Sequence, residues 1–167
     1  GRLVRGGLGY SGELGYELLV PRNEEEKLRS LLLDAGQPEE LPECSFDAAN
    51  TLRIESGYVL FDREIDGRAN PRELGLERLV SAPSRFEMSR RLVGLEILDE
   101  TAATDLSAAT VTSECRSPTF GSRIALGFAA PGTAAGEPVR LADGRAARIA
   151  SLPFYDGERK RPRGAAL

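Results

Sequence analysis

A glycine-rich stretch near the start of the chain constrains the fold more than any other sequence feature. Gly7, Gly9 and Gly12 have the spacing G-x-G-x-x-G of dinucleotide-binding sites, in which a strand enters the turn and a helix leaves it. Residues 16–20 follow the turn with aromatic and β-branched side chains and end at a proline, which favours a strand. The stretch therefore predicts a glycine turn between two strands within residues 2–20, and it argues against a dinucleotide site.

Helix signals follow this predicted hairpin. A helix is expected over residues 24–35, because Asn23 is a good N-cap residue and the glutamates after it suit the helix dipole. A second helix is expected over residues 45–56, ended by Gly57, and a short third helix from Asn70, where Asn-Pro-Arg-Glu has the order of cap, proline and N3 glutamate. The first helix would carry an apolar stripe of Leu28, Leu31, Leu32 and Ala35.

The pattern changes after about residue 88. Short strand-like runs, separated by Gly, Pro, Asp and Ser, cover residues 91–97, 109–115, 123–129 and 145–152. Regularly spaced strands with such turn signals are typical of a small barrel or sandwich. We therefore predict an α+β fold of three parts, with an α+β domain at 1–88, an antiparallel β-barrel at 89–160 and a basic tail at 161–167.

Composition excludes several classes of site. The 167 residues include no histidine, and Cys44 and Cys115 are far apart, so neither a zinc site nor Ser-His-Asp or Cys-His catalysis is expected. A net charge of −4 gives no reason to expect a nucleic-acid surface, and no apolar run is long enough to cross a membrane. Two lone cysteines without a disulfide framework favour a reducing, cytoplasmic location.

Four segments occur in an order that is specific to one protein family. They are GYSGELGYELLVP at 9–21, TLRIESGYVLFDREID at 51–66, VTSECRSPTFGSRIALGF at 111–128 and LPFYDGERKR at 152–161. Together they resemble the C-terminal half of the aminomethyltransferase family, the folate-binding superfamily of the glycine cleavage T-protein. The resemblance implies part of a folate-binding mixed α/β domain, followed by a small antiparallel barrel.

The resemblance also implies a function, namely tetrahydrofolate binding and one-carbon transfer. In the family reaction, folate N5 attacks the carbon of an aminomethyl group on a lipoyl arm, so the expected partners are folate and a lipoyl carrier protein. By the resemblance, Glu17 is the pterin-binding carboxylate, Tyr10 and Tyr58 line the pocket, and Glu13 and Arg161 are further cofactor-binding candidates. A carboxylate suits this role because it accepts the two adjacent N–H donors of a pterin.

Simpler interpretations of these residues stay open at this stage. Tyr10 and Glu17 could be ordinary strand residues, one packing on a sheet and the other facing solvent. For Arg53 we favour a structural ion pair over a contact with the ligand. No catalytic residue and no metal ligand is expected within the chain.

The chain departs from the family where an Arg-Asp pair normally precedes the second segment. Ala49 and Asn50 occupy these positions, and the family's arginine contacts folate. The family's catalytic aspartate belongs to the unmatched N-terminal half, so we expect the chain to be inactive alone. Two alternatives stay open: a folate-binding protein that supports iron–sulfur cluster or tRNA-modification chemistry, whose usual K-G-C-Y-x-G-Q-E motif we do not find, and the folate-channelling part of a demethylating flavoenzyme.

Overall fold

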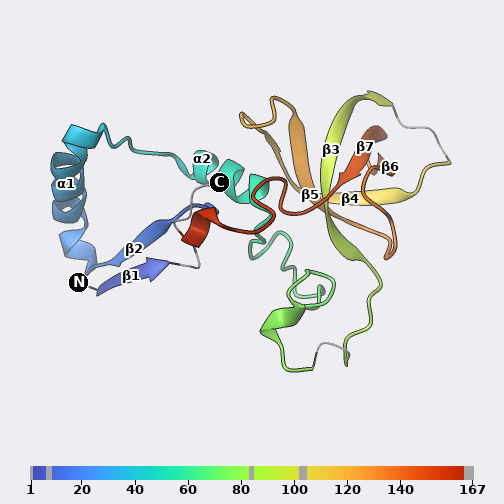
Figure 1. The fold of residues 1–167 in the computed structure, drawn as a ribbon, viewed down its shortest axis with the longest axis horizontal. Helices are drawn as coiled ribbons and strands as arrows, with labels where there is room; N and C mark the ends of the chain where they lie inside the picture. The colour runs from blue at the N-terminus through green and yellow to red at the C-terminus, as the bar shows by residue number, and fades with distance from the viewer. Residues whose placement is uncertain (1, 7–8, 83–84, 102–104, 164–167) are drawn as a thin grey trace.

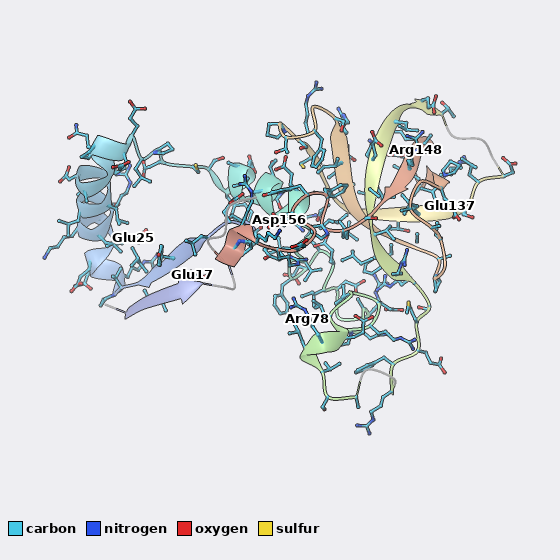
Figure 2. All side chains as sticks on the ribbon, viewed as in Figure 1. Glu17, Glu25, Arg78, Glu137, Arg148 and Asp156 are labelled. Atoms are coloured by element: carbon cyan, nitrogen blue, oxygen red, sulfur yellow. The ribbon has the colours of Figure 1, made fainter. Side chains whose placement is uncertain are left out.

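The computed structural model describes residues 2–6, 9–82, 85–101 and 105–163 (Figure 1). A hairpin and helix α1 lie at one end of the molecule, the barrel lies at the other, and α2 lies between them. Side chains such as Glu17 and Glu25 belong to the first region, whereas Glu137 and Arg148 belong to the barrel (Figure 2). The α+β fold is confirmed. Gly7 and the end of the predicted tail, 164–167, are outside the described residues.

In the part of the chain that the structure describes, the first region contains two strands and two α-helices, and the second contains five strands. The elements are β1 Arg2–Gly6, β2 Gly15–Leu19, α1 Glu25–Gly36, α2 Phe46–Glu55, β3 Arg91–Thr101, β4 Ala108–Arg116, β5 Arg123–Ala129, β6 Pro138–Leu141 and β7 Arg145–Ala150. Short 3-10 turns cover Arg22–Glu24, Gln37–Glu39, Glu77–Leu79 and Arg161–Arg163. Within the described residues, no helix combines the length and the apolar character needed to span a bilayer.

The hairpin forms as the glycine pattern predicts. Strands β1 and β2 pair antiparallel, with Arg2 opposite Leu19 and Gly6 opposite Gly15. The chain continues from Gly12 into strand β2, and no helix begins there. The dinucleotide interpretation is therefore wrong, because its phosphate site requires a helix N-terminus after the glycines.

Helices α1 and α2 form within one residue of the predicted ranges. The Ser45 hydroxyl accepts a hydrogen bond from the Ala48 amide (3.2 Å), which caps α2. The expected cap at Asn23 is wrong, because Asn23 lies inside a 3-10 turn and Glu24 is the residue that precedes α1. No residue of α1 is buried.

The third helix predicted from Asn70 does not form. The Asn70 side chain does accept hydrogen bonds from the amides of Arg72 (3.0 Å) and Glu73 (3.1 Å), as a helix cap would. However, Gly75 adopts a left-handed conformation with φ 69°, which ends the turn before a helix can propagate. The capping signal at Asn70 is therefore present, but it organises an isolated turn.

The second region is a closed five-stranded barrel in the order β3-β5-β4-β6-β7. All neighbours pair antiparallel except β4 and β6, which are parallel through Ala108 opposite Arg140 and Ala109 opposite Leu141. A fully antiparallel barrel was the expectation, but strand direction cannot alternate around a ring of five strands. The sequence pattern also missed β6, and it extended β7 to residue 152.

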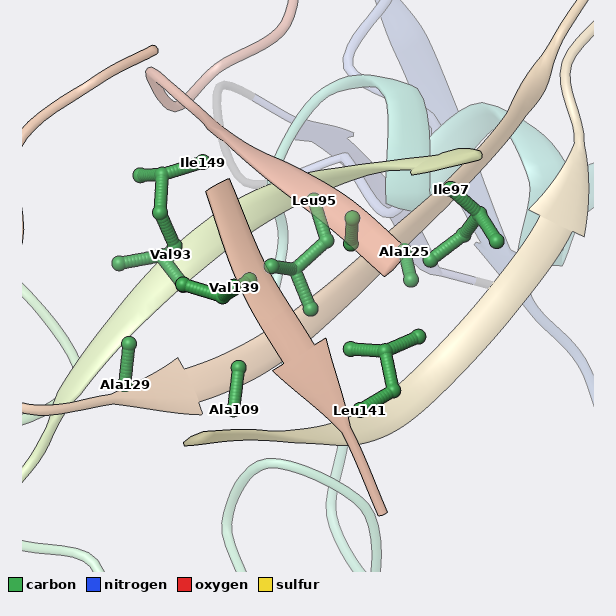
Figure 3. Close-up of a cluster of buried hydrophobic side chains, with 10 residues drawn as sticks. Val93, Leu95, Ile97, Ala109, Ala125, Ala129, Val139, Leu141 and Ile149 are labelled. Carbon is green, nitrogen blue, oxygen red and sulfur yellow. The ribbon is translucent and has the colours of Figure 1, made fainter. Parts of the chain in front are cut away.

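The barrel interior forms the main hydrophobic core (Figure 3). Alternate residues of β3 point inward, as a strand with one buried face requires. The ten buried residues are Val93, Leu95, Ile97, Ala109, Ala125, Ala129, Val139, Leu141, Ala147 and Ile149. Four of them are alanines, which fit the narrow interior of a barrel with so few strands.

Helix α2 is fixed to the barrel by an apolar contact and by a hydrogen bond from Arg53 to the Ser113 hydroxyl of β4 (2.6 Å), and a buried ion pair joins it to the loop that follows. Ile54 packs against Ile124 and Leu126 of β5. Arg53 donates to Glu64 (2.8 Å), and both side chains are almost completely buried. Burial acts to raise the pKa of Glu64, but hydrogen bonds, among them one from Ser113, hold it below its usual value. The prediction that Arg53 forms a structural ion pair is confirmed.

Candidate functional site

The glycine turn rests directly on the C-terminal end of α2. Gly12 is buried with φ 82°, and a Cβ atom there would lie 1.9 Å from the Ser56 hydroxyl oxygen. That hydroxyl donates to the carbonyl of Ser11 (3.0 Å). Gly57, with φ 66°, ends the helix just beyond this contact. Only glycine fits at Gly12, so the turn has a defined position on α2.

The C-terminal segment closes over the same turn. Glu13 pairs with the Arg161 guanidinium (2.5 Å) and accepts a hydrogen bond from the Tyr155 hydroxyl (3.1 Å). We call these three side chains the Glu13 cluster. The ion pair raises the pKa of Arg161, and burial raises the pKa of Tyr155, so both groups stay protonated at neutral pH. The cluster joins residues 148 positions apart in the sequence.

Two buried polar atoms beside the turn lack a partner in the described part of the chain. They are the hydroxyl oxygen of Tyr10 and Nε of Arg161. The Tyr10 ring stacks on Phe46, the first residue of α2, with centroids 6.1 Å apart. A buried polar group without a hydrogen bond is costly, so both atoms point to a polar group supplied from outside the described residues.

Tyr58 lies on the barrel side of the turn. The guanidinium of Arg159 stacks over its ring at 4.7 Å from the centroid. Its backbone amide donates to the carbonyl of Arg53 (2.8 Å), which fixes it just past the end of α2. Tyr58 borders a small pocket beside Gly12 and also a larger cleft in front of the barrel.

Glu17 is placed apart from the Glu13 cluster. It lies on β2 opposite Val4 and is exposed to solvent. No hydrogen bond or ion pair joins its carboxylate to a described side chain. Figure 2 shows Glu17 on the hairpin, whereas Asp156 lies on the C-terminal segment beside α2. The structure thus brings Glu13 and Arg161 together, with Tyr10 on the same turn, and leaves Glu17 free.

Sequence reasoning did not single out Tyr155. It belongs to the segment LPFYDGERKR, where the only signal was an aromatic residue in a loop rich in charge. Its contact with Glu13 depends on how the two ends of the chain meet, and local sequence does not specify this. In the described ranges, no group of three or more Cys, Asp or Glu side chains could hold a metal ion.

Comparisons with known proteins agree with this architecture. Residues 2–84 match the family model of the GCVT N-terminal domain, and residues 90–156 match that of the glycine cleavage T-protein C-terminal barrel domain. The boundary predicted at 88 and 89 falls between the two matched ranges and stays a prediction.

Individual relatives agree with the family models. An aminomethyltransferase of Streptomyces avermitilis is 34% identical over 88% of this chain and 48% of its own length. A probable aminomethyltransferase of Natronomonas pharaonis is 35% identical over 89% of this chain and 47% of its own length. The chain spans about half the length of the curated relatives it matches.

A solved structure shares the fold. The glycine cleavage system aminomethyltransferase T of Bartonella henselae superposes with a TM-score of 0.70 at 22% identity, covering 92% of this chain and 49% of that chain. The two family models and the relatives above converge on one conclusion: the chain belongs to the glycine cleavage T-protein family and corresponds to its C-terminal half.

Proposed function

We propose that this chain forms the folate-binding half of an aminomethyltransferase and that tetrahydrofolate binds beside the glycine turn. The observation that carries the proposal is the pair of buried, unpartnered polar atoms on Tyr10 and Arg161. A ligand with ring nitrogens and carbonyl oxygens would supply the missing hydrogen bonds. Family membership and the names of the relatives support the same cofactor.

The two glutamates of the turn have different roles in this proposal. Glu13 is committed to Arg161 and Tyr155 and holds the turn in place. Glu17 has no such commitment and is exposed two residues into β2. Its two carboxylate oxygens are therefore available to accept the adjacent N–H donors of a pterin ring.

The proposed reaction transfers an aminomethyl carbon from a lipoyl carrier protein to folate N5, with release of ammonia. Such a transfer requires the nucleophile to be held against the donor carbon in near-attack geometry. This chain contains no histidine, the carboxylate of Glu13 is already paired, and that of Glu17 is assigned to the pterin. We therefore expect the chain to bind folate, and we expect turnover to require the polypeptide that corresponds to the other half of the relatives.

Calorimetric titration with tetrahydrofolate tests the binding step. Glu17→Gln should weaken binding by about 1.5–3 kcal/mol for each hydrogen bond lost to the charged group. Glu24→Gln is the matched control, because Glu24 is also exposed and lies outside the turn. Unchanged affinity of Glu17→Gln would show that Glu17 is an ordinary surface residue of the strand.

A second assay tests the requirement for the other half. Formation of methylene-tetrahydrofolate from an aminomethyl-lipoyl carrier should stay at the uncatalysed rate with this chain alone. Turnover by the chain alone, abolished in Glu17→Gln, would place the catalytic carboxylate at β2 and contradict the proposed division of roles.

A further inference from the structure

The loop between strands β4 and β5 is held by a buried carboxylate of α2. Glu55 is 1% exposed and accepts hydrogen bonds from the hydroxyls of Ser117 and Thr119, the latter at 3.0 Å, and from the Thr119 amide (3.4 Å). The Ser117 hydroxyl in turn accepts a hydrogen bond from the amide of Phe120 (3.0 Å). These bonds fix the backbone of the loop as far as Phe120.

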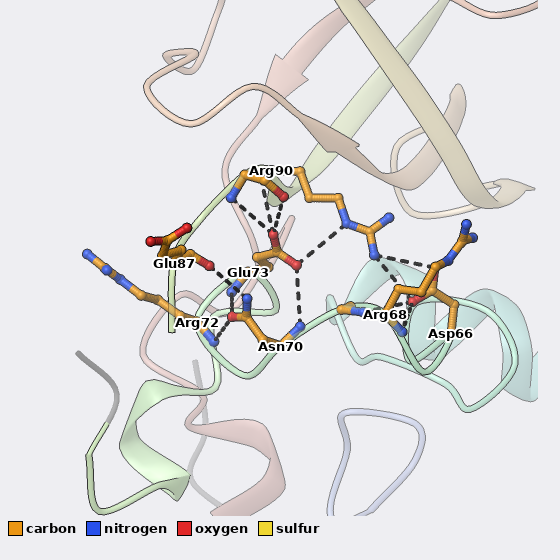
Figure 4. Close-up of polar contacts among 9 residues, drawn as sticks. Asp66, Arg68, Asn70, Arg72, Glu73, Glu87 and Arg90 are labelled. Atoms are coloured by element: carbon orange, nitrogen blue, oxygen red, sulfur yellow. Dashed lines mark hydrogen bonds and ion pairs between the residues drawn. The ribbon is translucent and has the colours of Figure 1, made fainter. Parts of the chain in front are cut away.

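Glu55 differs from the other two buried carboxylates of the described chain because it has no cationic partner. Glu64 pairs with Arg53 (2.8 Å), and Nε of Arg90 lies 3.6 Å from the Glu73 carboxylate (Figure 4). Among the described residues, no lysine or arginine forms an ion pair with Glu55. A carboxylate buried among neutral donors is costly, which indicates that the position of the loop it holds is important.

Phe120 is the large apolar side chain that this loop presents to solvent. It is 42% exposed, and its ring lies 6.0 Å from that of Phe154, measured between centroids, with the ring planes tilted by 53°. The amide of Phe154 donates to the backbone carbonyl of Glu55 (3.2 Å), so the same helix end fixes both segments. An exposed aromatic residue on a fixed backbone suits binding, because little conformational entropy is lost when a partner packs on it.

The two rings line a groove on the outer side of the barrel. The groove has a volume of about 310 Å³, and Ile124 and Pro153 add to its apolar lining. This volume is at the lower end of the range for small-molecule sites, so the groove fits one large side chain better than a whole cofactor. None of the residues proposed to hold tetrahydrofolate lines it.

The lining of the groove also includes a carboxylate that can accept a further cation. Of the described residues that line it, Glu96 is the only charged one. Glu96 lies on β3 between the inward-facing Leu95 and Ile97, and 46% of its side chain is exposed. Its contact with Arg148 on β7 is 3.9 Å long, which is too long for a hydrogen bond. The groove therefore combines aromatic walls with a negative charge.

We propose that this groove is a docking site for a segment of a partner protein that carries an aromatic side chain next to a lysine or an arginine. The aromatic side chain packs against Phe120 and Phe154, and the neighbouring cation pairs with Glu96. The charge of the groove and its size both support this occupant, because an aromatic side chain fills the apolar part and a basic neighbour complements the carboxylate.

Fluorescence titration with a short peptide tests the inference. The chain contains no tryptophan, so the emission of a tryptophan probe is observed without a background from the protein. The probe is the blocked tetrapeptide acetyl-Gly-Lys-Trp-Gly-amide, and its partner has glutamate in place of lysine. The lysine probe should bind about tenfold more tightly at low salt, which corresponds to 1.4 kcal/mol. This preference should shrink at high salt.

Two pairs of variants separate the aromatic contact from the charge. Phe120→Ala should weaken binding of the lysine probe about tenfold, whereas Phe61→Ala should leave it unchanged, because Phe61 is 75% exposed and lies outside the groove. Glu96→Gln should abolish the preference for the lysine probe, whereas Glu137→Gln should retain it, because Glu137 is also exposed and lies outside the groove. All four positions are at least partly exposed, so the variants should fold normally.

Four outcomes would overturn the inference. The first is equal affinity for the two peptides, and the second is unchanged binding of the lysine probe to Phe120→Ala. The third is equally tight binding of tryptamine, which would make the groove a site for small aromatic amines. The fourth is self-association of the chain in sedimentation experiments that is lost in Phe120→Ala, which would show that a second copy occupies the groove.

Discussion

The barrel and the region formed by the hairpin and α1 differ in how much apolar surface they bury. The barrel encloses ten buried side chains in one cluster. In contrast, α1 has no buried residue, and Leu31 is 57% exposed and Tyr16 of β2 is 58% exposed. A two-stranded hairpin is marginally stable alone, and a short helix depends on tertiary packing. The barrel therefore carries most of the stability of the described chain.

The two regions therefore differ in role: the proposed binding residue and the main source of stability lie in different parts of the molecule. The proposed pterin carboxylate, Glu17, lies on the weakly packed hairpin, whereas the main hydrophobic core lies inside the barrel. Exposed apolar side chains on neighbouring elements are typical of a face that packs against further polypeptide. We infer that a ligand or a covering polypeptide stabilises the hairpin more than the barrel.

The largest expected effect concerns the junction between the two regions. Glu64→Leu removes the partner of the buried Arg53 and should reduce the free energy of unfolding by about 3–5 kcal/mol. The control is Glu96→Gln, because its contact with Arg148 is exposed and 3.9 Å long and should contribute less than about 1 kcal/mol. Urea denaturation followed by circular dichroism measures both. Equal losses of unfolding free energy in Glu64→Leu and Glu96→Gln would show that the buried ion pair contributes no more than an exposed one.

The second prediction compares the two regions directly. Leu95 is completely buried in the barrel, so Leu95→Ala should cost about 2–5 kcal/mol. Leu31 is exposed on α1, so Leu31→Ala should change the free energy of unfolding by no more than about 0.5 kcal/mol. The same urea denaturation measures both. If Leu31→Ala proved as costly as Leu95→Ala, α1 would be covered in solution, and the comparison between the regions would fail.

Local signals in the sequence were enough to predict the main elements. Both helices, the hairpin and four barrel strands follow from periodicity and from turn and helix-end residues. The short β6 was missed because four residues that begin with a proline carry little pattern. The sequence at Asn70 predicts a helix that does not form, because a cap specifies only the first turn and Gly75 ends that turn.

The candidate site was harder to predict because it depends on contacts between distant segments. Glu13 and Arg161 were named as separate candidates, but their ion pair closes a separation of 148 residues. The unpartnered atoms of Tyr10 and Arg161 are properties of burial, which sequence does not give. For Arg53 the general expectation suffices, because a helix arginine forms a structural ion pair more often than a ligand contact, and the buried pair with Glu64 confirms it.

The third prediction concerns how the glycine turn is seated. Gly12→Ala would combine a left-handed φ with a clash against Ser56, whereas Gly144→Ala has a similar φ of 89° and open space around it. The left-handed backbone alone should lower the free energy of unfolding by about 1–3 kcal/mol. Gly144→Ala measures this loss, and the loss in Gly12→Ala should be larger. Hydrogen exchange should show faster exchange at the amides of residues 13–16 only in Gly12→Ala. Equal behaviour of the two variants would mean that the turn is not fixed on α2.

The smallest expected effect is a pH dependence within the barrel. Glu114 on β4 accepts hydrogen bonds from Arg145 on β7 (2.8 Å) and Arg123 on β5 (3.0 Å), and the bonds from Arg145 are the main cause of its lowered pKa. A carboxylate with a lowered pKa in the folded state contributes stability above its unfolded-state pKa of about 4.3. This contribution is lost as the pH falls through the folded-state pKa. Glu114→Gln should therefore be slightly less stable at neutral pH and should lose less stability on acidification.

Because the Glu114 carboxylate is partly exposed and screened, this difference in stability should be small and should fall further at high salt. Urea denaturation at a series of pH values measures it. Parallel pH profiles for wild type and Glu114→Gln would show that these ion pairs do not contribute to the stability of the barrel.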